Sequence, residues 1–224
     1  MRSLPLPLAL TARLSPVVVL AAAGWALSSG PLAAPQAAAH KPAEEKTETR
    51  AASAPSTATA TVSKAYSAAP APCDSVAEKT IESLVPGAKA RGKEIPSTDT
   101  KLRRTCSWNA LKGYDYRWLD VSYEVMESDE AAQKAYQEHT GRKSGGGAVP
   151  GLGDSAYSVV TLTTEDKQET REGVVIARAS NALVTITYNG SDFESKKAPG
   201  TDTINKGAIK AAKEAVAALE ADEG

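Results

Sequence analysis

The sequence predicts an α+β fold, in which helices pack on one face of a single antiparallel sheet of about five strands, in the order αββαβββα. Alternating apolar and polar residues, typical of half-buried strands, occur in runs that are joined by short turns. Three further segments repeat their apolar residues at the helical period of 3.6. Because parallel strands need long crossovers, short turns indicate antiparallel pairing.

The chain begins with an apolar run at 17–27 that follows two arginines and has the length of a signal-peptide core. Ala37–Ala39 offers a cleavage site and Ala26–Ser28 an earlier one, while an uncleaved anchor is the alternative. We therefore expect residues 1–39 to be a signal peptide or membrane anchor. The protein would then be extracytoplasmic, either secreted or associated with the cell envelope.

Residues 40–72 are rich in Ala, Pro, Thr, Ser, Lys and Glu, and Val62 and Tyr66 are the only large apolar side chains among them. Such a segment cannot bury enough apolar surface to offset its ordering entropy, so we expect a disordered tether. The folded domain is then predicted to span 73–224.

The first predicted element of this domain is a helix that starts after Asp74 and Ser75. Glu78 lies three residues beyond Ser75, as in a capping box, and Pro86-Gly87 ends the helix. Its apolar face comprises Ala77, Ile81, Leu84 and Val85. Residues 88–102 are polar and predict a loop or a weak edge strand.

Two strands are predicted next, at 104–111 and 115–126, with a turn at Lys112-Gly113. In the second strand, apolar residues alternate with a more polar set. A helix follows Ser128 and ends near Gly141. Its predicted apolar face comprises Ala132, Ala135, Tyr136 and His139.

After a glycine-rich connection, three strands are predicted at 155–163, 171–180 and 182–189. The turns between and after them are a tight hairpin at Ser180-Asn181 and a turn at Asn189-Gly190. An amphipathic helix at 203–219 closes the domain.

The chain has two cysteines, Cys73 and Cys106. In an exported protein such a pair is most simply a disulfide. The alternative is a lipidated Cys73. It is disfavoured because no apolar run leads directly into that residue.

Three short motifs carry a resemblance to a known family: Pro72-Cys73-Asp74, Cys106-Ser107-Trp108 and the segment 151–156, Gly-Leu-Gly-Asp-Ser-Ala. Over about 73–220 the chain resembles an actinobacterial extracytoplasmic domain family of unknown function, whose members are often lipoproteins. The resemblance implies an α+β domain, a Cys73–Cys106 bridge and an extracytoplasmic location. It implies no activity, and the chain departs from the lipoproteins because no cysteine follows its apolar run.

Charge and composition exclude several classes of function. From Cys73 onward, 20 lysines and arginines stand against 24 aspartates and glutamates, a net charge of −4 with scattered basic residues. Nucleic acid is therefore not an expected partner. His139 is the only histidine beyond the tether, so we expect it to pack, and expect no catalytic constellation, metal or cofactor.

The candidate ligand-binding residues are Tyr116 and Trp118 on the polar side of the second strand, with Asp120, Glu124 and Asp154. Exposed aromatic side chains favour recognition, but a covered face or swapped faces would give the same pattern. For Asp154 the favoured role is to cap the turn after the glycines with its carboxylate, and a ligand-binding role is the alternative.

We expect a noncatalytic binding or interaction domain of the cell envelope, with a small ligand or an envelope protein as its partner. The alternatives are a hydrolase that uses carboxylates such as Asp120 and Glu124, or a membrane-tethered sensory or structural module. Membrane association would arise only through an uncleaved N-terminal segment.

Overall fold

The computed structural model describes residues 65–222, so the predicted signal segment and most of the predicted tether lie outside the described residues. Seven strands form one antiparallel sheet. They are β1 (Lys93–Ile95), β2 (Arg103–Lys112), β3 (Asp115–Val125), β4 (Gly147–Ala148), β5 (Ser155–Glu165), β6 (Gln168–Ala179) and β7 (Ala182–Asp192).

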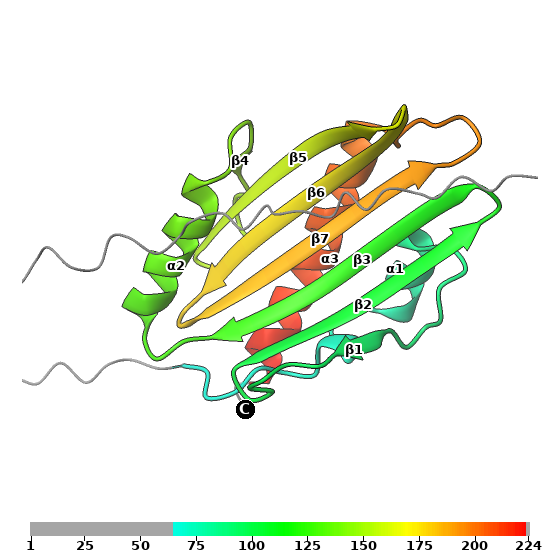
Figure 1. Ribbon diagram of the computed structural model, residues 1–224. Coiled ribbons are helices and arrows are strands. Elements are labelled where there is room, and N and C mark those ends of the chain that lie inside the picture. Colours follow the sequence, from blue (N-terminus) through cyan, green and yellow to red (C-terminus); the bar gives the residue numbers. More distant parts are fainter. Residues whose placement is uncertain (1–64, 223–224) are drawn as a thin grey trace, which may run out of the picture. The chain divides into compact units, whose positions relative to one another are not determined.

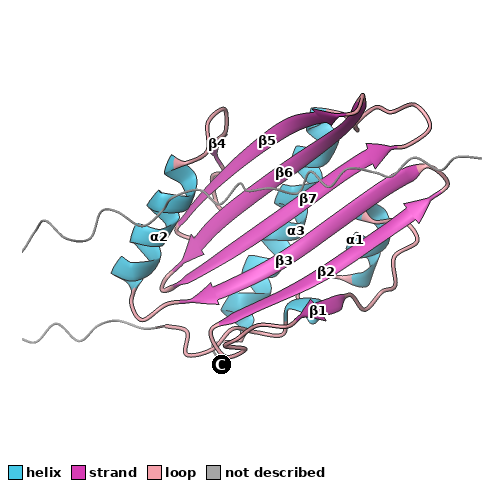
Figure 2. Ribbon diagram, viewed as in Figure 1, coloured by secondary structure: helices cyan, strands magenta, loops and turns pink. Residues whose placement is uncertain are grey.

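Four helical segments accompany the sheet, whose strands lie side by side in the order β1-β2-β3-β7-β6-β5-β4 (Figure 1). They are the 3-10 helix η1 (Pro72–Asp74) and the α-helices α1 (Glu78–Leu84), α2 (Asp129–Gly141) and α3 (Thr201–Ala221). The predicted α+β class and single antiparallel sheet are confirmed, and Figure 2 shows how the strands dominate the domain.

The predicted strand number and order are wrong, because the short edge strands β1 and β4 add to the five long strands. β1 lies within 88–102, where the sequence predicts a loop or a weak edge strand, and the edge strand is confirmed. β4 has two residues, too few to produce a recognisable alternation. The hairpin at Ser180-Asn181 is confirmed, since these two residues separate β6 from β7.

The predicted turn at Asn189-Gly190 is also wrong, because β7 runs on to Asp192. Gly190 lies within the strand, where an added Cβ would stand 2.6 Å from the guanidinium of Arg117 and 2.9 Å from the ring of Pro199. The glycine therefore permits close packing rather than a turn.

Helices α1 and α3 cover one face of the sheet, which we call the closed face (Figure 1). In the middle of this face the strand residues are inaccessible; Leu119, Val121 and Tyr123 of β3 are each 0% exposed. Two buried tyrosines tie the helices to the sheet. The Tyr123 hydroxyl donates to the Ala215 carbonyl at 2.8 Å, and the Tyr188 hydroxyl donates to the Leu84 carbonyl at 2.7 Å.

Helix α2 packs on the opposite face, so the expectation that all helices share one face is wrong. Tyr136 of α2 contacts a small cluster made by Val159, Val174 and Ile176. These strand positions alternate with the residues of the closed face. The predicted N-cap is confirmed, since the Ser128 hydroxyl accepts from the Ala131 N–H at 3.1 Å. His139, expected to pack, is exposed instead.

Helix α1 starts at Glu78 without the predicted capping box. Ser75 instead donates its hydroxyl to the Pro72 carbonyl at 2.8 Å. The start of α1 is capped from α3, where the Glu214 carboxylate accepts from the Ala77 N–H at 2.9 Å and the Thr80 hydroxyl at 2.7 Å. A partner so distant in sequence leaves no local signal.

The packed part of the chain begins before Cys73. Tyr66 and Ala69, which composition placed in the tether, are each only 6% exposed. The fully buried Asn181 accepts from the Tyr66 N–H at 2.8 Å and donates to the Tyr66 carbonyl at 2.9 Å. Tyr66 and Ala69 therefore pack with the residues that follow Cys73.

The expected disulfide joins Cys73 of η1 to Cys106 of β2, with 5.1 Å between the two Cα atoms. It fixes the helical start of the domain to the sheet. Among residues 65–222 we find no helix with the length and apolar character needed to cross a membrane.

Candidate functional site

The face of the sheet turned away from α1 and α3 is the candidate site, and we call it the open face. Helix α2 covers part of it, where Tyr136 contacts Val159, Val174 and Ile176. The β3 residues on this face are half-buried and alternate with the closed-face residues, as the sequence predicts. They are Tyr116, Trp118, Asp120, Ser122 and Glu124.

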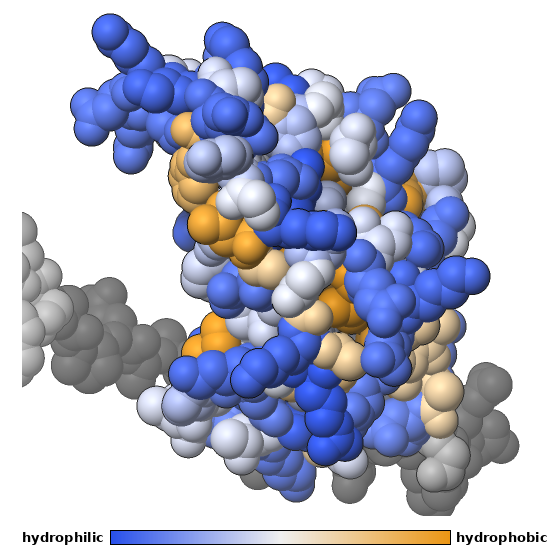
Figure 3. Space-filling model, turned by 90° about the vertical axis from the view of Figure 1, so that its right-hand side faces the viewer, coloured by the Kyte–Doolittle hydropathy of each residue, from blue (hydrophilic) through white to orange (hydrophobic). Residues whose placement is uncertain are grey.

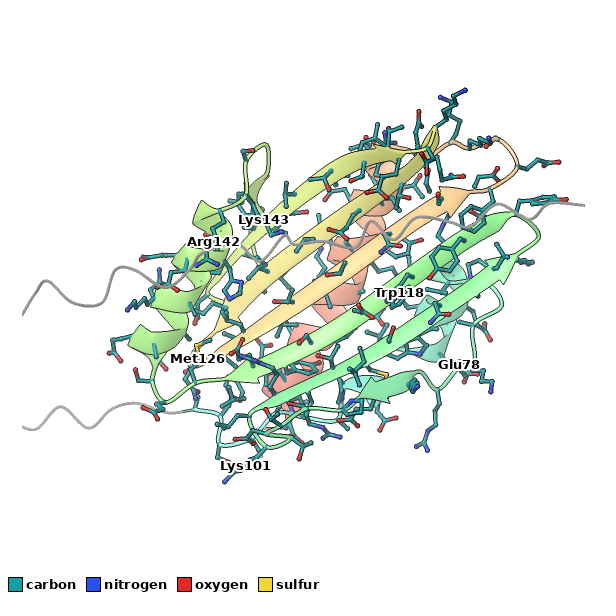
Figure 4. The ribbon with its side chains drawn as sticks, in the orientation of Figure 1. Glu78, Lys101, Trp118, Met126, Arg142 and Lys143 are labelled. Atoms are coloured by element: carbon teal, nitrogen blue, oxygen red, sulfur yellow. A yellow bond between two sulfur atoms is a disulfide. The ribbon has the colours of Figure 1, made fainter. Side chains whose placement is uncertain are left out.

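Aromatic rings gather on the open face at the end of the sheet where β2 turns into β3. The Tyr116 ring stacks on that of Phe193 with centroids 5.9 Å apart, and it meets the Trp118 indole edge to face at 6.3 Å. Trp118 is labelled on β3 in Figure 4. The aromatic patch comprises these three residues with Tyr114 and Leu111, and Leu111, Tyr114 and Phe193 are 56%, 57% and 46% exposed.

Apolar surface at this end of the molecule is divided into separate areas. Figure 3 views the molecule from the right-hand side of Figure 1, and its orange areas are separated by blue polar side chains. A divided surface of this kind suits a ligand that is itself partly polar better than a wholly apolar one.

Asp120 orients the indole of Trp118. Its carboxylate accepts from the indole N–H at 2.6 Å, one side-chain position further along the same face of β3. Burial raises the pKa of the Tyr116 hydroxyl, and the negative charge of Asp120 adds to that rise. Tyr116 thus remains a neutral hydrogen-bonding group beside the carboxylate at physiological pH.

Neutral polar side chains continue the open face beside the aromatic patch. In the register of β3 and β7, Asn189 lies opposite Trp118, Thr187 opposite Asp120 and Thr185 opposite Ser122. On the β2 side the Ser122 hydroxyl is 2.8 Å from that of Thr105. Hydroxyl and amide groups both donate and accept, so this strip can bind either kind of polar partner.

The two candidate carboxylates of β3 do not form a pair. Asp120 and Glu124 are four residues apart on one strand, which separates their Cα atoms by about 13 Å. Asp120 is engaged by Trp118, and Glu124 forms an ion pair with Arg103. Carboxylates that share the work of glycoside hydrolysis lie within about 10 Å of each other.

Asp154 belongs to a different part of the molecule. Its carboxylate lies 3.0 Å from the Arg178 guanidinium and accepts from the Ser180 N–H at 2.7 Å. These contacts fasten the start of β5 to the end of β6. Asp154 therefore holds two strands together, and the structure does not bring it to the aromatic patch.

Two surface hollows lie away from the aromatic patch. One of ≈ 420 Å³ lies between α2 and Arg178, and one of ≈ 270 Å³ lies beside Cys73. Both are lined by side chains of either charge, and Arg178 is already paired with Asp154. No group of three His, Cys, Asp or Glu residues among residues 65–222 is placed to hold a metal ion.

Sequence reasoning missed Phe193, Leu111 and Tyr114. Phe193 was missed because the predicted strand ends at Asn189, whereas β7 continues to Asp192 and Phe193 follows it directly. The observed register also places Leu111 beside Tyr116. The alternation of β7 was the one signal that could have found the stacked partner of Tyr116.

No protein-family model and no curated protein sequence matches the chain. Among solved structures, it is similar to a protein of Bacteroides thetaiotaomicron VPI-5482 with 9% identity and a TM-score of 0.33. That match covers 53% of this chain and 47% of the other, so the chain spans about half the length of the neighbour.

Proposed function

We propose that this chain is a noncatalytic binding domain that works outside the cytoplasm and holds a neutral polysaccharide of the cell envelope against its open face. One observation carries the proposal: the aromatic patch around Tyr116, Trp118 and Phe193 lies next to a strip of neutral hydroxyl and amide side chains. The resemblance to actinobacterial envelope domains agrees with this location.

The chemistry of the face favours sugar rings. Each ring of a saccharide has apolar C–H faces that can lie on an indole or phenol, and hydroxyls that both donate and accept. The Trp118 indole N–H donates to the Asp120 carboxylate at 2.6 Å, so the indole is oriented before any ligand arrives. Asn189 and Thr187 stand beside it for the hydroxyls.

The shape of the face favours an extended polymer. Small-molecule sites are typically concave and enclose most of the ligand, whereas the aromatic patch lies on a sheet surface beside exposed side chains. A polysaccharide gains contacts along the length of the strands instead. The separation and engagement of Asp120 and Glu124 support a binding role over hydrolysis.

The extracytoplasmic location rests on two supports. The Cys73–Cys106 bridge is of a kind that persists in oxidising compartments. The apolar run at 17–27 has the pattern of a signal or anchor segment.

The proposal is tested by incubating the purified full chain with an array of bacterial envelope polysaccharides and their fragments. The wild type should bind at least one neutral polysaccharide. Trp118→Ala should weaken that binding at least tenfold, because Trp and Tyr anchors dominate such contacts.

Ile95→Ala is the matched control, since Ile95 is 42% exposed but lies on β1, outside the aromatic patch. It should bind as the wild type does. Equal binding by wild type and Trp118→Ala, or no binding to any polysaccharide on the array, would reject the proposed site.

A further inference from the structure

The two edges of the sheet are only partly covered by the short strands β1 and β4. Within the described residues, β1 pairs with β2 at 105–107, and β4 pairs with β5 at Tyr157 and Ser158. β5 then continues to Glu165 without an outer neighbour in this part of the chain. Such an edge presents backbone N–H and C=O groups that can pair with another strand.

The edge at 159–165 has little of what usually protects an open strand, since its one charged residue is Glu165 at the end. It reads Val-Val-Thr-Leu-Thr-Thr-Glu, without proline or lysine. Its pairing with β6 is unbroken from Ser155 to Glu165, so no bulge turns it away. Leu162 is 50% exposed at its centre. The equivalent open stretch of β2 is shorter and ends in Lys112.

The outward backbone groups of this edge can be identified from the pairing with β4. The Val149 N–H donates to the Ala156 carbonyl at 2.9 Å, so the backbone of Ala156 faces outward. Residues whose backbone N–H and C=O groups point outward alternate along a strand, and those of Ser158 face its pairing partner Gly147. The outward residues that no described strand pairs with are Val160, Leu162 and Thr164.

We propose that this edge pairs with the same edge of a second copy of the chain, antiparallel and about a two-fold axis at Leu162. In that register Leu162 faces Leu162 of the second copy, and Val160 faces Thr164. Each of these outward pairs exchanges two hydrogen bonds. If the second copy slid by two residues along the strand, one outward residue would face Ser158, which already pairs with Gly147, or the turn at 166. One hydrogen-bonded pair between the copies would then be lost.

The side chains also favour a second copy as the partner. Thr161 faces Thr163 of the other copy, and Thr–Thr pairs across strands are favourable. Glu165 faces Val159, so no like charges oppose each other. A strand edge that pairs with its own copy about a two-fold axis forms a closed, isologous dimer.

Cross-linking tests the register. Both native cysteines are in the disulfide, so Leu162→Cys in the full chain introduces one free thiol. The two Leu162→Cys thiols should be joined in high yield by a short bis-maleimide, because facing Cα atoms lie about 5.5 Å apart. Thr164→Cys is the control, since its two copies would lie about 14 Å apart. Equal yields for the two variants would overturn the register.

Sedimentation of the full chain tests the dimer itself. A contact of this size is weak, so the measurement should extend to about 100 μM. Wild type and Ile95→Lys, which alters the opposite edge outside the aromatic patch, should reach twice the mass of one chain. Leu162→Lys should remain monomeric, because lysines would face each other at the axis. A monomeric wild type, or a dimer of Leu162→Lys equal to that of wild type, would refute the proposal.

Discussion

Outside the area that α2 covers, the closed and open faces of the sheet differ in burial and in the chemistry of their side chains. On β7, Ile186 points to the closed face and is 0% exposed, while the adjacent Thr187 points to the open face and is half-buried. The closed face is apolar and covered by α1 and α3, whereas the open face carries aromatic rings, hydroxyls and amides. Because successive side chains alternate, one sheet can separate folding from recognition residue by residue.

The sharpest test of this separation compares those two neighbours on β7. Ile186→Ala should lower the free energy of unfolding by about 2–5 kcal/mol, because it leaves a cavity in the packed core. Thr187→Ala should lower it by less than about 1 kcal/mol. Urea unfolding of both variants provides the measurement, and equal losses would show that the two faces contribute alike to stability.

The disulfide should strengthen the closed side of the sheet without shaping the open face. Replacing both Cys73 and Cys106 by Ser removes a cross-link between residues 33 positions apart. The expected loss is about 3–4 kcal/mol in the chain-entropy model. Urea midpoints with and without the bridge give the value. Loss of polysaccharide binding under conditions where the variant stays folded would contradict the separation of the two faces.

The cap that α3 provides for α1 should contribute less. Glu214→Ala leaves the Ala77 N–H and the Thr80 hydroxyl without their carboxylate partner. We expect a loss of about 1–3 kcal/mol in thermal or urea unfolding. Glu220→Ala on the exposed side of the same helix is the control and should change little. Equal losses in the two variants would mean that the cap does not stabilise α1.

Alkaline pH should affect the closed face through its buried tyrosines. Burial raises the pKa of Tyr123 and of Tyr188, so the fold favours their neutral forms. The stability they contribute is fully present below the unfolded pKa of about 10 and falls as pH rises above it, by up to about 1.4 kcal/mol per pH unit for each group. Unfolding measured from pH 8 to 11 should show a shallower decline in Tyr123→Phe, and an unchanged decline would contradict this account.

The sequence predicts the long elements because their periodicity extends over many residues. The alternation in β3 correctly places Tyr116 and Trp118 on one face of the strand and Leu119 and Val121 on the other. The two-residue β4 is too short to show a pattern. The Asn189-Gly190 pair is typical of a turn, but Gly190 lies within β7, where it permits close packing against Arg117 and Pro199. These differences arise from tertiary contacts, which local sequence does not record.

The candidate site was predictable to the same extent. Two of its aromatic residues lie on a strand whose alternation is clear, whereas Phe193 lies beyond a glycine that ended the predicted strand too early. Asp154 was proposed as a ligand-binding residue from its position after glycines, but its carboxylate fastens β5 to β6. Identifying its partners required the register of the β5–β6 hairpin, which places Arg178 beside the start of β5.

The most direct test of the central claim measures stability and binding on one protein, Trp118→Ala. Because the indole lies on the open face, we predict a change in the free energy of unfolding within about 1 kcal/mol. We also predict at least a tenfold weaker affinity for the polysaccharide that the wild type binds on the array. A loss of several kcal/mol in stability together with unchanged affinity would contradict the account, since Trp118 would then serve the fold rather than recognition.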